Sequence, residues 1–258
     1  MTVQLIIPMS GLGSRFANQG YRDLKPLIRV HNRPIIEWVL RMFPETDDPM
    51  FICRQDHLET TEMRDVLEAI KPKGKIVAID GDKLGPVGAL TAAFNEIDDK
   101  ASVLISYCDF YMTWEYKSFI SFVESQGYDG AIPCYSGFHP HLLPKDNLYA
   151  SCRVNDTKEL LNIREKFSFD IDKTKALHSP GVYYFKSGKL LKHYCKALVN
   201  SGETLGGEYY VSLVYNEMVA DGLRIYVPEN VEHFCQWGTP SDLEDYLYWT
   251  SIILGKNA

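Results

Sequence analysis

The sequence of 258 residues has no long hydrophobic run, no closely spaced cysteine pair and no excess of positive charge. A membrane-spanning helix needs about 18 or more apolar residues in a row, and no stretch approaches that length. The chain enters an apolar segment without a basic region or a small-residue cleavage site, so we expect no signal peptide. The six cysteines are scattered without a Cys-x-x-Cys pair, which is typical of reduced thiols and predicts a cytoplasmic protein.

The net charge of −7 disfavours a nucleic-acid partner, because nucleic-acid-binding surfaces are usually basic. Apolar residues make up 45% of the chain and charged residues 24%, which is ordinary for a protein with a buried core. A small anionic ligand remains compatible with this balance, because it needs only a local basic pocket. We therefore expect neither nucleic acid nor membrane as a partner. The oligomeric state stays open, with a homo-oligomer as one option.

The glycine-rich stretch SGLGSRFANQGYRDLKPL, residues 10–27, lacks both familiar phosphate-loop spacings. Phe16 stands where a dinucleotide-binding G-x-G-x-x-G loop needs its third glycine, and no G-K-[ST] follows. The stretch does have small residues, whose backbone N–H groups can form a concave donor surface for phosphate oxygens. Arg15 adds a bidentate guanidinium and Lys25 a mobile point charge. These features predict a nucleoside triphosphate site that neutralises charge on the α-phosphorus and on the leaving pyrophosphate.

Apolar, β-rich segments alternate with helical spacing over the first ~125 residues. This order predicts an α/β protein with a doubly wound, mostly parallel sheet flanked by helices. In such sheets ligands bind beyond the carboxyl ends of the strands, so the glycine loop and Asp109 are expected to share one site. The expected strands are 3–9, 27–30, 49–54, 74–80 and 102–110, and the expected helices are 34–43, 57–70, 84–97 and 114–127.

The second half of the chain is predicted to add short strands in a mixed or antiparallel arrangement. Three more helices follow, the last with Ser241 as its N-cap. No linker, repeat or low-complexity segment appears, so we expect one domain over residues 1–258. Its first half, to about residue 130, is expected to bind nucleotide, and residues from about 131 to 258 are expected to bind the acceptor.

The run IIPMSGLGSRF followed by KPL resembles the signature of the nucleotidyltransferase superfamily, the pyrophosphorylases. These enzymes join a nucleoside triphosphate to a sugar phosphate or a similar phosphate and release pyrophosphate. LGPVGAL, residues 84–90, is similar to the family segment that approaches the base. The resemblance implies catalytic roles for Arg15 and Lys25. It also implies nucleotide binding by Met9, Ser10, Gly11, Leu12, Gly13, Ser14, Arg15, Lys25, Gly85, Pro86, Gly88 and Cys108.

The segment SYCDF resembles the strand end whose acid binds the catalytic Mg²⁺ in this family, which makes Asp109 the expected ligand. Many members carry a second metal-binding Asp in a W-x-D-I-G-T-P-E run near the C-terminus. The corresponding run here is FCQWGTPSDL, with Gln236 at the expected position of that Asp. An amide oxygen can coordinate Mg²⁺ but brings no charge. The second ligand is therefore Gln236, another acid, or no protein group.

Three further segments resemble acceptor-binding parts of the family, namely IREKF, SPGVYYF and GGEYYVSLVYN. They imply that the acceptor contacts Lys166, Gly181 and Glu208. For Lys166 and its neighbour Glu165, an exposed ion pair at a strand edge is the alternative.

A histidine-containing segment, GFHPHLLPKDNLYASCRV, is not explained by a generic sugar pocket. On a strand, His139 and His141 would face the same side. With Lys145 they could bind an anionic or carboxylate-bearing acceptor, although an ordinary loop is an equal alternative. Two histidines without a third ligand make a poor zinc site.

These features together are most similar to capsule-locus cytidylyltransferases, which couple CTP to phosphoglutamine and form CDP-L-glutamine in capsule phosphoramidate modification. The resemblance implies a Mg²⁺-dependent enzyme with CTP and a small phosphorylated acceptor as its partners. One alternative is the same chemistry on a sugar 1-phosphate, which makes a nucleoside diphosphate sugar. Another is a regulatory nucleotide-binding protein without turnover, suggested by Gln236.

Overall fold

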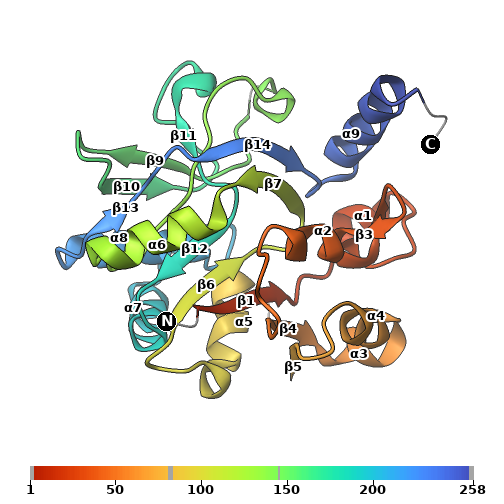
Figure 1. Ribbon diagram of the computed structural model, residues 1–258, viewed down its shortest axis with the longest axis horizontal. Helices are drawn as coiled ribbons and strands as arrows, with labels where there is room; N and C mark the ends of the chain where they lie inside the picture. The colour runs from red at the N-terminus through yellow and green to blue at the C-terminus, as the bar shows by residue number, and fades with distance from the viewer. Residues whose placement is uncertain (1–2, 81–83, 145, 256–258) are drawn as a thin grey trace.

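The computed structural model describes residues 3–80, 84–144 and 146–255, and Lys145 therefore lies outside the described residues (Figure 1). A seven-stranded sheet runs through the molecule in the order β13-β8-β12-β6-β1-β4-β5. In chain order its strands are β1 (Val3–Met9), β4 (Met50–Arg54), β5 (Lys75–Ile79), β6 (Ser102–Ser106), β8 (Gly130–Ala131), β12 (Val182–Phe185) and β13 (Ile225–Tyr226).

Most neighbours in this sheet pair in parallel, and β12 runs antiparallel to both β6 and β8. From β1 the chain moves outward to β4 and β5, then returns to β6 on the other side of β1. The connections leaving β1 and β6 therefore diverge, and a crevice forms at this topological switch point. The predicted α/β fold with a mixed, mostly parallel sheet is confirmed.

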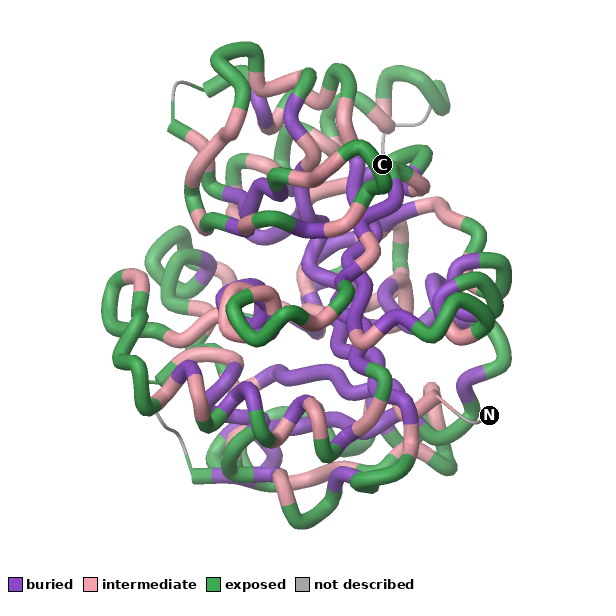
Figure 2. Tube along the Cα trace, turned by 90° about the vertical axis from the view of Figure 1, so that its left-hand side faces the viewer, coloured by how far each residue is buried: buried purple, intermediate pink, exposed green. Residues whose placement is uncertain are grey.

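Alternating residues of β1 enter two separate cores on the two faces of the sheet. Leu5 and Ile7 belong to one core and Ile6 to the other, and all three are at most 1% exposed. This burial on both faces explains the nearly continuous apolar run of the strand. Figure 2 shows buried backbone through the interior and exposed loops around it.

The helices divide between the two faces according to the core that each one enters. The core containing Leu5 also receives α2 (Ile35–Arg41), α3 (Gln55–Thr60), α4 (Met63–Ile70) and α6 (Tyr116–Gln126). The core containing Ile6 receives α5 (Gly85–Ala92), α7 (Gly188–Ser201) and α8 (Val211–Ala220). Within the described residues, no helix is long and apolar enough to cross a membrane.

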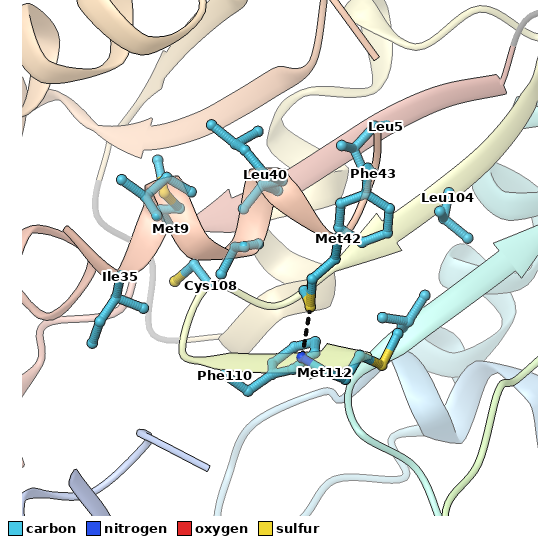
Figure 3. Close-up of a cluster of buried hydrophobic side chains, with 14 of the residues drawn as sticks. Leu5, Met9, Ile35, Leu40, Met42, Phe43, Leu104, Cys108, Phe110 and Met112 are labelled. Carbon is cyan, nitrogen blue, oxygen red and sulfur yellow. Dashed lines mark hydrogen bonds between the residues drawn. The ribbon is translucent and has the colours of Figure 1, made fainter. Parts of the chain in front are cut away.

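Figure 3 shows part of the first core, with Met9 and Cys108 among its side chains. The side chains of Met9 and Cys108 lie in this cluster and are 3% and 8% exposed. The backbone N–H of Met112 donates to the sulfur of Met42 over 3.1 Å, which joins the C-cap residue of α2 to β7 (Phe110–Trp114). Hydrophobic packing therefore reaches up to the residues that line the crevice.

Three smaller sheets accompany the seven-stranded sheet in the described residues. β9 (Ser151–Val154) lies between β10 (Leu160–Arg164) and β11 (Leu177–His178). β7 pairs antiparallel with β14 (Val231–Gln236), and β2 (Arg29–Val30) pairs with β3 (Arg33–Pro34). The remaining elements are α1 (Ser14–Asn18), α9 (Pro240–Ile253) and the 3-10 helices η1 (Lys25–Leu27), η2 (Phe94–Glu96), η3 (Pro140–Leu142) and η4 (Lys173–Lys175).

Several predicted boundaries were wrong for identifiable reasons. The strand expected over 102–110 is two strands, because the chain turns between β6 and β7 after Ser106. The helix expected over 57–70 is interrupted between α3 and α4, where Thr61 has an extended conformation. The N-cap of α9 is Thr239 and not Ser241, since the Thr239 hydroxyl accepts a hydrogen bond from the Asp242 N–H.

Candidate active site

The loop that follows β1 presents backbone donors at the switch point. Gly13 has a φ of 63°, a left-handed conformation that favours glycine, and it starts α1. In the described part of the chain, the N–H groups of Gly11, Leu12 and Gly13 donate to no protein acceptor. Leu12 is 58% exposed, so its side chain does not anchor the loop in the core. This geometry leaves the N–H groups available to phosphate oxygens.

Lys25 and Asp109 form an ion pair across the crevice, although 84 positions separate them in the chain. Lys25 begins η1, Asp109 lies in the turn between β6 and β7, and Nζ is 2.8 Å from Oδ2. Each side chain is 24% exposed. Burial is the largest single effect and disfavours the ammonium group, but the charge and hydrogen bond of Asp109, together with the nearby Cys108, outweigh it and raise the pKa of Lys25 above its ordinary value. Lys25 is therefore held charged at the point where β1 and β6 diverge.

Gln236 lies beside this ion pair. It pairs with Phe110 across β14 and β7, and the next residue, Trp237, donates its backbone N–H to the Asp109 carbonyl over 3.0 Å. A Cβ atom at position 238 would lie 2.7 Å from the Gln236 amide nitrogen and 3.0 Å from Asp109 Oδ2. Gly238 thus keeps open a small space between an amide and a carboxylate.

These groups fit a hard divalent cation that takes most of its ligands from substrate and water, as Mg²⁺ does. Asp109 supplies a charged oxygen, Gln236 supplies an amide, and Gly238 leaves room beside both. Over residues 3–80, 84–144 and 146–255, no cluster of three or more His, Cys, Asp or Glu side chains could hold a metal alone. A cation bound here would therefore depend on the phosphates of the substrate.

The crevice is a cavity of about 780 Å³, a size typical of small-molecule sites. It brings together most of the residues expected from the sequence, from both halves of the chain. The predicted residues that line it are Met9, Ser10, Gly11, Leu12, Gly13, Ser14, Arg15, Lys25, Gly85, Pro86, Cys108, Asp109, Lys166, Gly181, Glu208 and Gln236. Because the side chains of Met9 and Cys108 are buried in the core, their backbone is what they can offer to a ligand.

Gly88 does not line the cavity, contrary to its expected contact with the base. It lies within α5, and a Cβ atom at this position would be 2.6 Å from the Cβ of Leu84. The reason for glycine here is close packing against Leu84. Gly85, at the start of the same helix, does face the cavity and has a φ of 75°.

The two predicted acceptor histidines are also absent from the cavity lining. They lie at η3 and not on the expected strand, although their ring centroids are 5.4 Å apart and both rings pack on Tyr135. His141 Nε2 is 2.9 Å from the Tyr135 hydroxyl, and His139 Nε2 is 3.2 Å from the Ser136 carbonyl. Burial, reinforced by neighbouring histidines, lowers the pKa of His141 to about 3. Both rings belong to an aromatic cluster and bring no positive charge to the acceptor.

The end of the cavity expected from the sequence to bind the acceptor contains two carboxylates and a lysine. Glu165 and Lys166 follow β10, and Lys166 has a φ of 50°. Burial raises the pKa of Glu165 to about 7, although a hydrogen bond from the Ser212 hydroxyl and the charge of Lys166 oppose this shift. Glu208 is exposed and accepts a hydrogen bond from the Tyr210 hydroxyl over 3.0 Å.

Sequence reasoning missed several residues that line the cavity. They include the aromatic residues Tyr107, Tyr149, Tyr183 and Tyr210, and the cation Arg54. Tyr183 lies in the recognised segment SPGVYYF, where its strand position could have suggested a role. Arg54 is the last residue of an expected parallel strand, and that position was a usable signal.

A family model described as a MobA-like NTP transferase domain matches residues 5–168, more than half of the chain. The chain belongs to the MobA-like NTP transferase family. It is therefore a nucleotidyltransferase. No curated protein sequence matches it.

Solved structures with the same fold include other nucleotidyltransferases at low sequence identity. A nucleoside-diphosphate-sugar pyrophosphorylase from Vibrio cholerae RC9 is 21% identical, with a TM-score of 0.75 over 95% of this chain and 100% of its own. An inositol-1-phosphate CTP transferase from T. maritima is 15% identical, with a TM-score of 0.67 over 99% of this chain and 97% of its own. A UDP-glucose pyrophosphorylase complexed with UDP-glucose is 13% identical, with a TM-score of 0.71 over 98% of this chain and 100% of its own.

The lowered pKa of His141 predicts acid sensitivity of this NTP transferase. An unfolded histidine has a pKa near 6.5. Below that pH, His141 is therefore protonated in the unfolded chain but stays neutral in the folded chain. The free energy of unfolding is therefore unaffected by this histidine above pH 6.5 and decreases as the pH falls towards 3. Between pH 7.5 and 5.0, we expect wild type to lose about 1–2 kcal/mol more than His141→Gln in urea unfolding. His193→Gln, at an exposed position of α7, is the control, and equal losses in wild type and His141→Gln would contradict the prediction.

Proposed function

We propose that this nucleotidyltransferase is a Mg²⁺-dependent cytidylyltransferase that couples CTP to phosphoglutamine, forming CDP-L-glutamine and pyrophosphate. We further propose that it acts in the cytoplasm, in capsular polysaccharide modification. The observation that carries the catalytic part is the Lys25–Asp109 ion pair, 2.8 Å long, at the point where β1 and β6 diverge. The cation and the acid that the proposed chemistry needs line the same cavity as the glycine loop.

The chemistry needs no protein nucleophile, because positioning and charge stabilisation are sufficient. An oxygen of the acceptor phosphate attacks the α-phosphorus in line, and the bond from that phosphorus to the β-phosphate oxygen breaks. The N–H groups of the glycine loop and Arg15 hold the triphosphate. Lys25 stabilises the charge that develops at the α-phosphate. Asp109 and Gln236 would hold Mg²⁺, which when bound neutralises phosphate charge.

CTP as the nucleotide is supported by the shared fold of the inositol-1-phosphate CTP transferase, whose name describes a reaction of CTP with a phosphorylated alcohol. The choice of acceptor no longer depends on His139 and His141. Instead, an amino-acid acceptor carries an α-ammonium group, which Glu208 and the ionised form of Glu165 can bind. Its phosphate or α-carboxylate suits Lys166.

A sugar 1-phosphate is the second candidate acceptor. It is favoured by the hydroxyl groups of Tyr183 and Tyr210 and by the carboxylates of Glu165 and Glu208 around the acceptor end. These groups can serve as hydrogen-bond partners for sugar hydroxyls. Nucleoside-diphosphate-sugar pyrophosphorylases also share the fold.

The decisive experiment combines four nucleoside triphosphates with phosphoglutamine and a panel of sugar 1-phosphates. Pyrophosphate release is measured as kcat/KM in the presence of Mg²⁺. We expect the highest value for CTP with phosphoglutamine. A clear preference for any sugar 1-phosphate would overturn this acceptor assignment. Tight nucleotide binding without turnover of any pair would indicate a regulatory binder.

Lys25→Ala should reduce kcat by about 10² or more, because it removes one preorganised charge from the transition state. Lys25 is not part of the hydrophobic core, so the fold should persist, as checked by circular dichroism. Lys189→Ala, at an exposed position of α7, is the matched control and should keep wild-type kcat. Near-normal turnover by folded Lys25→Ala would remove the role assigned to this residue.

Asp109→Asn should reduce Mg²⁺-dependent activity more severely than Gln236→Ala. Asp109 brings the charged oxygen at this position, whereas the Gln236 amide is neutral. Activity is measured as a function of Mg²⁺ concentration for both variants and wild type. The opposite order, with Asp109→Asn nearly silent, would show that the metal assignment is wrong.

A further inference from the structure

Arg54 lies in the nucleotide half of the cavity and has no part in the mechanism above. It is the last residue of β4, directly after Cys53, which pairs with Met9 of β1. Arg54 therefore lies beside the start of the glycine loop. On its other side, β5 leads towards Gly85, at the segment expected to approach the base.

The guanidinium group is fixed by a single carboxylate. Its Nε donates to Asp56 Oδ1 over 2.9 Å and its Nη2 donates to Oδ2 over 2.7 Å, a bidentate arrangement. The Arg54 side chain is only 17% exposed, whereas that of Asp56 is 55% exposed. Among the residues that the structure describes, Nη1 donates to no acceptor. One edge of the guanidinium group is thus occupied, and the edge formed by Nη1 and Nη2 keeps two parallel donors.

Sheet order separates Arg54 from the reacting phosphate. β4 is the second strand from β6, and Asp109 follows the end of β6. Neighbouring strands lie about 4.8 Å apart, so the end of β4 is about 10 Å from the end of β6. With the α-phosphate at Lys25 and Asp109, the base can reach this position if the nucleoside extends towards β4 and β5, the side of the segment at Gly85 that is expected to approach the base.

We propose that Arg54 reads the base of the nucleotide and that the base it selects is cytosine. Cytosine presents N3 and O2 as two adjacent acceptors, which match the two parallel donors of the free guanidinium edge. Uracil carries a proton on N3, so it would set one donor against another. In nucleic-acid recognition an arginine edge contacts two adjacent acceptors, O6 and N7, of guanine, so GTP is the competing nucleotide that the test includes. The inference rests on the proposed function in that it needs a nucleotide in this cavity.

The test measures equilibrium binding without acceptor, so it does not depend on turnover. CTP, UTP, GTP, ATP and inorganic triphosphate are titrated in the presence of Mg²⁺ into wild type, Arg54→Met, Arg54→Lys and Arg153→Met. Arg153 is an exposed arginine of β9 outside the cavity and serves as the matched control. Thermal unfolding establishes that each variant is folded, and Arg54→Lys serves as a second probe if Arg54→Met is not.

We expect Arg54→Met to weaken CTP binding by about 5- to 150-fold, the range for one bidentate arginine–base contact. Its preference for CTP over UTP should fall by a similar factor, and Arg54→Lys should lose most of the preference. Binding of inorganic triphosphate should stay at the wild-type value, because it has no base.

Equal weakening of CTP and inorganic triphosphate by Arg54→Met would overturn the proposal, since Arg54 would then contact phosphate. An unchanged preference for CTP over UTP, or a wild-type preference for GTP, would overturn it as well. If wild type binds CTP selectively through Arg54 but transfers it to no acceptor, the base assignment holds and the proposed function fails.

Discussion

The central sheet is buried on both faces, and the placement of the active site follows from this constraint. Since neighbouring residues of β1 such as Leu5 and Ile6 enter opposite cores, the strand offers no face to a ligand. Polar chemistry is therefore restricted to the loops at the strand ends. The switch point between β1 and β6 is the place where such loops diverge. There, opposite charges can meet while each stays partly hydrated, which avoids the large penalty of a fully buried pair.

The cavity contains two cations that are each paired with a carboxylate. Lys25 is held by Asp109, and Arg54 is held by Asp56, so each cation is oriented before a ligand arrives. Binding then needs less ordering of long, flexible side chains. The net charge of −7 does not reveal these cations, because each is balanced locally by a carboxylate. Overall charge therefore indicates which class of macromolecule could bind but not which charges line the cavity.

Local patterns predicted the sheet and the nucleotide loop well, because a buried strand and its following loop are encoded in adjacent residues. Long-range pairing could not be predicted in the same way. β14 meets β7 across more than a hundred residues, and only this pairing brings Gln236 beside Asp109. His141 was misplaced because no local signal distinguishes a ring packed on Tyr135 from one facing a ligand. Arg54 was missed although it ends an expected strand, because its position beside β1 appears only in the folded sheet.

The reversed direction of β12 has a consequence for how such a protein can diversify. Because β12 runs antiparallel to β6, its amino end lies at the edge where the parallel strands have their carboxyl ends. The segment before β12, which contains Gly181, therefore reaches the cavity although it lies far from the glycine loop in the sequence. Insertions before β12 can remodel the part of the cavity near Gly181 without changing the spacing of β1, β4 and β6. The two parts of the cavity are thereby built from distant segments of the chain, so each can change in sequence without altering the other.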